Sequence, residues 1–337
     1  MKKYFIFIVL MVGSVLSLKQ ANAQETNDFY DDAPTVLLGV PKVMVGGELV
    51  TSFEVDFSLL NLRSVVVKEA RLVDGKDEFV GAYRYDGYSL YDILNLAVLK
   101  KKNEAVFKPI IDLYVEVENA QGEKVTLSWG ELYYPIHRHE ILIATQVARI
   151  VPSKTKELWP LPTEPKLVVA SDLVTARNIT APTKITVLSY GGTYPVNKGM
   201  KPMYAGSVAY VDAKGTSEII NEQLLIGDKM VYSSVFYGRG TGIHGITDFK
   251  GVQLKQMLAG KLPFDEKTLM NGKLITIGKD GYRGVFTVAE VFNRNDQAEL
   301  LIFDEGTNTD GGRYKLFPAA DFFSDRAIKS LVEIRFE

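Results

Sequence analysis

Two sequence blocks recur in the same order in the two halves of the chain, and this internal repeat restricts the fold more than any other feature. Residues 85–94 (YDGYSLYDIL) correspond to 249–258 (FKGVQLKQML): each block has an aromatic residue two positions before a glycine and a leucine three positions after it. Residues 166–172 (KLVVASD) correspond without gaps to 315–321 (KLFPAAD). Because both blocks keep their order, duplication of one structural unit is the favoured interpretation.

A stretch rich in glycine and proline separates the two halves. Residues 189–204 have this composition, which is typical of a linker. We therefore expect one domain at 35–188 and a second at 205–337, preceded by a flexible lead at 24–34. Segments of this length are each long enough to bury a core of their own.

The start of the chain has the three parts of a secretory signal peptide. Two lysines follow Met1, an apolar run extends from Tyr4 to Leu18, and an Ala-x-Ala site ends at Ala23. No later stretch approaches the roughly 18 apolar residues of a membrane-spanning helix. We expect residues 1–23 to be removed, the mature chain to begin near Gln24, and the protein to reach the periplasm or cell surface without an integral membrane segment.

Composition excludes several classes of site. The chain has no cysteine, so disulfides, thiolate nucleophiles, iron–sulfur clusters and zinc–thiolate sites are excluded. Its formal net charge is −2, and no basic stripe suited to a phosphate backbone is evident, so nucleic acid is not an expected partner.

Hydrophobic periodicity predicts mostly strands. Alternation of apolar and polar residues, the pattern of half-buried strands, is clearest at 113–118, 124–128, 184–188 and 332–336. Helical spacing is found in short segments such as 90–97 and 254–259, which open just after the repeated glycines. The predicted fold class is α+β, mostly β with short helices.

The second half carries four motifs in a recognisable order. An aromatic-x-Gly-Val-x-Leu helix start, an Asp-Gly-Tyr turn, a Gly-Arg-Tyr-Lys-Leu-Phe-Pro segment and a lysine-containing approach to the last strand lie at 249–258, 280–291, 312–318 and 326–336. This order resembles the molybdopterin-binding domain of the sulfite oxidase family. The first half resembles it less closely, with residues 119–122 (NAQG) in place of the Asp-Gly-Tyr turn. The resemblance implies two tandem sulfite-oxidase-like domains, the first of them degenerate.

The same resemblance implies a missing metal ligand. Members of the family hold molybdenum through a pterin dithiolene and one cysteine thiolate upstream of the Gly-Val-x-Leu block. The matching stretches here are 65–71 and 230–240, with Ser233 or Ser234 nearest the expected place, and neither stretch contains the soft thiolate that suits such a centre. We therefore expect no cofactor. Molybdopterin, with a serine alkoxide as ligand, enters by resemblance alone.

The glycine-rich segment 237–245 (YGRGTGIHG) is a candidate ligand loop. Its last six residues match G-x-G-x-x-G, but the strand-like segment 246–249 follows where a dinucleotide site requires a helix. Either the glycines serve a tight turn, or backbone N–H groups together with Arg239 and His244 receive an anion. Lys315 stands where the family often has a cofactor-facing arginine; the alternative is a solvated strand end.

Two histidines form a separate candidate site. If the segment is a strand, His137 and His139 share a face and both imidazoles can reach one metal ion. Two ligands are insufficient for a closed site, and Glu140 would point the other way. The alternative interpretation is a polar strand end beside residues 133–135.

Three functions remain open. The first is an exported, non-catalytic binding or assembly protein on a molybdopterin-domain scaffold without its metal centre, with an unknown small molecule or protein as partner, bound near 233–245 or between the domains. The second is an oxidoreductase that binds molybdopterin without a thiolate, through Ser233, Arg239 or His244. The third is a metal-binding module that uses His137 and His139, completed across a dimer.

Overall fold

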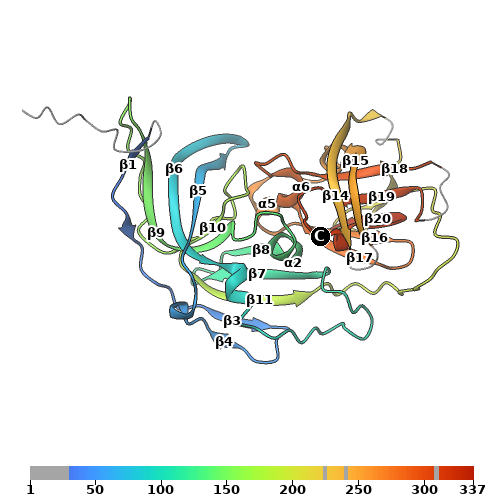
Figure 1. Ribbon diagram of the computed structural model, residues 1–337, viewed down its shortest axis with the longest axis horizontal. Helices are drawn as coiled ribbons and strands as arrows, with labels where there is room; N and C mark the ends of the chain where they lie inside the picture. Colours follow the sequence, from blue (N-terminus) through green and yellow to red (C-terminus); the bar gives the residue numbers. More distant parts are fainter. Residues whose placement is uncertain (1–29, 223–225, 239–241, 307–310) are drawn as a thin grey trace, which may run out of the picture.

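The computed structural model describes residues 30–222, 226–238, 242–306 and 311–337 (Figure 1). Strands make up 44% and helices 11% of the structure, and four small sheets are arranged like the blades of a four-bladed propeller. In Figure 1 the blue-to-green first half and the orange-to-red second half lie side by side. No helix in the described ranges is long and apolar enough to cross a membrane.

Sheets I and II come from the first half of the chain. Their strands are β1 (Tyr30–Asp32), β2 (Val36–Leu37), β3 (Met44–Gly47), β4 (Phe53–Glu54), β5 (Arg63–Val73), β6 (Lys76–Ser89), β7 (Leu113–Asn119), β8 (Lys124–Ser128), β9 (Ile141–Pro152), β10 (Lys166–Val169) and β11 (Pro182–Ser189). The helical elements of this half are η1 (Phe57–Leu59), α1 (Leu90–Leu94) and α2 (Trp129–Tyr133).

Sheets III and IV come from the second half. Their strands are β12 (Ala209–Val211), β13 (Ser217–Ile219), β14 (Lys229–Gly238), β15 (Gly242–Gln253), β16 (Lys273–Gly278), β17 (Arg283–Thr287), β18 (Leu300–Asp304), β19 (Tyr314–Pro318) and β20 (Leu331–Phe336). The helical elements of this half include α4 (Leu254–Met257), α5 (Glu266–Asn271), α6 (Val288–Phe292) and η2 (Ser324–Arg326).

The two halves have the same strand order. Sheet II runs β4-β3-β11-β7-β8 and sheet III runs β13-β12-β20-β16-β17. Sheet I contains β5-β6-β9-β10 with β1 and β2 added on β9, and sheet IV runs β14-β15-β18-β19. The registers also correspond, because Val65 lies opposite Tyr85 in one hairpin and Tyr232 lies opposite Phe249 in the other. The internal repeat expected from the sequence is therefore present in the topology.

The predicted α+β fold of two tandem sulfite-oxidase-like domains is wrong. The structure is a mostly β, propeller-like arrangement of four sheets. The sulfite oxidase fold and the molybdopterin-binding scaffold predicted from the resemblance are therefore withdrawn. The physical reason is that the shared motifs specify local events, such as a helix start or a tight turn. Such events recur in many β-rich chains and do not determine how whole sheets pack against one another.

Local elements follow the sequence pattern closely. The strands predicted at 113–118 and 124–128 are β7 and β8, and those predicted at 184–188 and 332–336 lie within β11 and β20. The predicted helices open at Leu90 and Leu254 but are shorter than the apolar spacing indicated. Isolated helices of one or two turns are marginal, so tertiary packing determines where they end.

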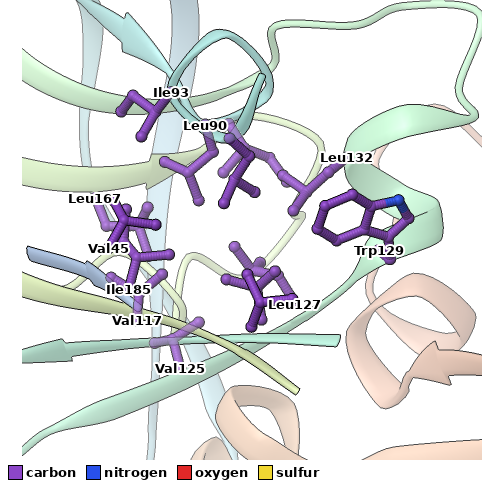
Figure 2. Close-up of a cluster of buried hydrophobic side chains, with 14 of the residues drawn as sticks. Val45, Leu90, Ile93, Val117, Val125, Leu127, Trp129, Leu132, Leu167 and Ile185 are labelled. Carbon is purple, nitrogen blue, oxygen red and sulfur yellow. The ribbon is translucent and has the colours of Figure 1, made fainter. Parts of the chain in front are cut away.

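The largest hydrophobic core lies in the first half (Figure 2). Val117, Val125 and Leu127 from sheet II face Leu90 of α1 and Leu132 of α2, and all five are buried. Alternate residues of β7 and β8 thus supply one apolar face, as the period of two in the sequence requires. Burial of each such side chain contributes about 1.5–3 kcal/mol before chain entropy is considered.

The two halves meet through paired contacts that repeat the internal symmetry. The Leu173 N–H donates to the Asn293 carbonyl at 2.7 Å, and the Phe322 N–H donates to the Tyr134 carbonyl at 2.7 Å. In the repeat, Leu173 corresponds to Phe322, because both follow the aspartate that ends the second repeated block. The contact between the halves is therefore approximately two-fold symmetric within one chain.

A buried ion cluster lies beside this contact in the first half. The Arg177 guanidinium donates to Asp172 at 2.7 and 2.8 Å and lies 2.9 Å from Glu131, and it reaches Thr287 of the other half at 3.3 Å. Burial raises the pKa of Glu131 to about 7; Arg177 opposes this rise and Glu290 adds to it.

The second half repeats the cluster. Arg326 donates to Asp321 at 2.6 and 2.7 Å and to Glu290 at 2.8 Å, and it reaches Ser128 of the first half at 3.2 Å. Burial acts to raise the pKa of Glu290, but Arg326 together with hydrogen bonds from Ser128 and Thr287 holds that pKa below its usual range. Ser128 and Thr287 also cap α2 and α6 in matching capping boxes. These clusters are part of the contact between the halves.

Candidate ligand pocket

A cavity of about 740 Å³ lies on sheet IV, on the face turned away from the core of the second half. Its floor is formed by four phenylalanines from the four strands of this sheet: Phe236, Phe249, Phe303 and Phe317. Cavities of roughly 300–1,000 Å³ with apolar linings are the usual sites for small ligands. The sheet therefore presents a preformed, aromatic-floored pocket.

The floor rings pack together as an apolar platform. Phe249 stacks on Phe317 with ring centroids 4.1 Å apart and on Phe303 with centroids 5.7 Å apart, at interplanar angles of 16° and 14°. Phe236 is tilted against Phe249 at 6.4 Å. Alternate residues of neighbouring strands share a face, which brings these rings together from distant parts of the sequence. A platform of this kind suits the apolar side of a ligand.

Charged residues surround the platform, and most of the carboxylates are already bound. Asp304 accepts two hydrogen bonds at 2.9 Å from the Arg313 guanidinium, which holds the pKa of this carboxyl below its usual range. Glu305 pairs with Lys315 at 2.6 Å. Asp248 accepts a hydrogen bond from Ser233 at 2.6 Å. These carboxylates are thus fixed by protein partners.

One lysine at the rim differs from these carboxylates. Lys329 lines the pocket and is exposed, and it forms no ion pair with any residue that the structure describes. Lys250 alternates with Phe249 on β15 and therefore lies on the other face of the strand, with Ile246. The polar rim thus carries one ammonium group that can pair with a ligand. Thr247 and Ser324 add hydroxyl groups to the same wall.

The pocket includes or borders several predicted site residues. Lys315 lines it, although its ammonium group is bound to Glu305. Ser234 lies on β14 opposite the pocket-lining Thr247, and its half-buried side chain belongs to the same alternating set as Phe236. Ser233 is exposed on the other face of the strand. The hydroxyl of Ser233 is engaged by a carboxylate and the chain offers no cysteine, so this donor set does not fit a molybdenum centre.

The described residues of the glycine-rich segment lie at the ends of two paired strands, β14 and β15. Gly238 is paired with Gly242, and β15 continues from Gly242 as a strand, so no helix opens at the G-x-G-x-x-G motif. The dinucleotide interpretation is therefore wrong at this position. Arg239 lies outside the described residues, and His244 lies on β15 with a side chain that is also outside the description.

His137 and His139 lie in the loop between α2 and β9. They are not on the strand that the sequence pattern had suggested. They line one small cavity of about 20 Å³ together with Glu140. The His139 Nδ1 lies 3.1 Å from the Ser89 hydroxyl, and burial lowers the pKa of its imidazole although Asp92 opposes that effect. Within the described ranges, no three histidine, aspartate or glutamate side chains are grouped to hold a metal ion.

The four phenylalanines were not predicted as site residues, although the repeat carries a signal for them. Phe249 stands in the second half where the first half has Tyr85, and Phe317 stands where it has Val168. Both changes place a larger apolar surface on the same strand face. Comparing the two copies position by position would have marked this face as different.

No family model matches the chain, and no curated protein matches it.

Proposed function

We propose that this chain is an exported, non-catalytic binding protein whose ligand occupies the phenylalanine pocket of sheet IV. The observation that carries the proposal is the preformed cavity of about 740 Å³ over four phenylalanines. An apolar floor with a few polar groups at its rim is the usual composition of a small-ligand site, since burial supplies affinity and the polar groups fix orientation.

Export is part of the proposal and rests on residues 1–23. Their lysine pair, apolar run and Ala-x-Ala site are typical of a signal peptide. A chain without cysteine gains no disulfides in an oxidising compartment, so its stability there depends on its cores and on the buried ion clusters.

The test is equilibrium binding of a hydrophobic fluorescent dye, 1-anilinonaphthalene-8-sulfonate, to the folded protein. Its sulfonate can pair with a rim lysine while its rings contact the phenylalanine platform. In the repeat, Thr247 occupies the position of Tyr83. Thr247→Tyr therefore places an aromatic ring in the pocket, and the fold of the first half already accommodates such a ring at the equivalent position. Ile246→Tyr, at an exposed neighbour on the other strand face, is the matched control.

We expect saturable binding by the wild type and the control, and affinity at least about tenfold lower for Thr247→Tyr, which corresponds to about 1.4 kcal/mol. Saturable binding that is equal in all three proteins would place the dye elsewhere and contradict the proposal. Circular dichroism of each variant verifies that the fold is retained.

A further inference from the structure

The face of sheet I that corresponds to the phenylalanine pocket is covered by the chain itself. Tyr85, Ala144 and Val168 occupy the positions of Phe249, Phe303 and Phe317 in the strand registers of the two halves. These residues belong to a buried cluster against which Trp159 and Leu161 pack. Within the ranges that the structure describes, this face is therefore covered in the first half and open in the second.

The cover in the first half is an extended, proline-containing segment, residues 158–162 (LWPLP). The Tyr83 hydroxyl donates to the Pro160 carbonyl at 2.5 Å, and the Trp159 indole donates to the Ile150 carbonyl at 3.2 Å. The Trp159 ring also meets Phe79 edge-on, with centroids 5.1 Å apart. Aromatic contacts together with backbone carbonyl acceptors hold this segment on the sheet.

The second half has a shorter connection at the corresponding place. β9 has 12 residues and is followed by residues 153–165, whereas β18 has 5 residues and is followed by residues 305–313. Val45 of β3 and Tyr210 of β12 lie at equivalent places in the two halves. The same spacing makes Met203, which lines the pocket, equivalent to Leu38, which belongs to the buried cluster on the corresponding face. Among the described residues, no counterpart of Trp159–Leu161 lies on sheet IV.

The character of the face also changes between the copies. In the first half Glu69 lies at its centre and binds Lys166 at 2.7 Å and the Tyr85 hydroxyl at 2.9 Å. In the second half Phe236 takes the position of Glu69, and Lys315 takes that of Lys166. Sheet IV thus has an apolar side chain, Phe236, where sheet I has the carboxylate that binds Lys166 and Tyr85. This difference favours an apolar ligand on sheet IV.

We propose that the phenylalanine pocket binds, from a partner chain, an extended proline-containing peptide with a large apolar side chain. This inference rests on the proposed function. It follows from the cover on sheet I, where a segment of this kind from the same chain packs on the corresponding face, and aromatic-lined surfaces are the usual receptors for extended proline-rich segments.

The test uses a synthetic peptide with the sequence of residues 155–165 (TKELWPLPTEP) and the full mature chain. This peptide contains the segment that covers sheet I. Because sheet I is covered by its own chain, sheet IV is the available site. Isothermal titration calorimetry measures affinity for the wild type, Thr247→Tyr and the control Ile246→Tyr.

We expect one binding site in the wild type and the control, and a loss of at least about tenfold in affinity for Thr247→Tyr. A peptide with Trp159→Ala should bind more weakly than the parent peptide, because it lacks the large apolar side chain. Peptide binding that Thr247→Tyr leaves unchanged would overturn the inference.

The dye titration separates the two proposals. If Thr247→Tyr weakens binding of the dye but the peptide does not bind to the wild type, the peptide inference is overturned. The pocket then remains a site for small apolar ligands. If neither binds, both proposals are overturned.

Discussion

Replacing Arg177 by methionine should destabilise the protein strongly at neutral pH. The Arg177 side chain is 1% exposed, and its guanidinium is shared by Asp172 and Glu131, which are themselves 2% and 4% exposed. Methionine retains much of the apolar volume but leaves both carboxylates buried without their cation. Removing one partner of a buried ion pair typically costs about 3–5 kcal/mol.

The pH dependence of this loss follows from the same contacts. Without Arg177 the folded-state pKa of both carboxyls rises further above their unfolded values. A carboxyl with a raised folded pKa favours folding when it is protonated, and that contribution is lost as pH rises through the interval between the two pKa values. The deficit of Arg177→Met should therefore be largest near pH 8 and smaller near pH 5.

The assay is urea unfolding followed by circular dichroism at both pH values. Arg326→Met provides an internal replicate, because Arg326 holds Asp321 and Glu290 with the same geometry. Arg335→Met is the contrasting control: Arg335 is 29% exposed and paired with Glu333, so its loss should cost less than about 1 kcal/mol. The reasoning is refuted if Arg177→Met lies within about 1 kcal/mol of the wild type at pH 8.

Three further predictions concern stability and processing. The raised pKa of Glu131 makes the free energy of unfolding of the wild type fall as pH rises from about 4.5 to 7. Glu131→Gln lacks this titration, so its stability relative to the wild type should be higher at pH 8 than at pH 5. Unfolding titrations that give the same difference between the two proteins at both pH values would contradict this. Leu127→Ala should lower the free energy of unfolding by about 2–5 kcal/mol by leaving a cavity in the first core, measured by urea titration, whereas exposed Leu37→Ala should have little effect. The mature protein from an exporting host should begin near Gln24, and an intact mass that includes residues 1–23 would rule out cleavage at Ala23.

Strand positions could be predicted from the sequence because they depend on local alternation. Residues 113–119 place Leu113, Val115 and Val117 on one face, and all three are buried in β7. The short helices could also be located, since a glycine followed by Leu90 or Leu254 marks their start. Their ends depend on packing, which the spacing of apolar residues alone does not encode.

The overall fold and the pocket could not be predicted in the same way. Motifs at 249–258 and 280–291 specify a helix start and a turn, but the order in which strands join a sheet is a non-local property. Phe249 and Phe317 come within 4.1 Å only because β15 and β19 flank β18. The strand geometry assumed for His137 and His139 could not be checked from the sequence, and the structure places both residues in a loop.

The most direct test of the central claim is nuclear magnetic resonance of protein labelled with ¹³C on phenylalanine rings during titration with the dye and with the peptide. Phe236, Phe249, Phe303 and Phe317 form the pocket floor, whereas Phe264 lies outside it. We expect saturable shifts of the four floor signals, with the Phe264 signal unchanged. Shifts confined to other phenylalanines, with the four floor signals unmoved at saturation, would contradict it.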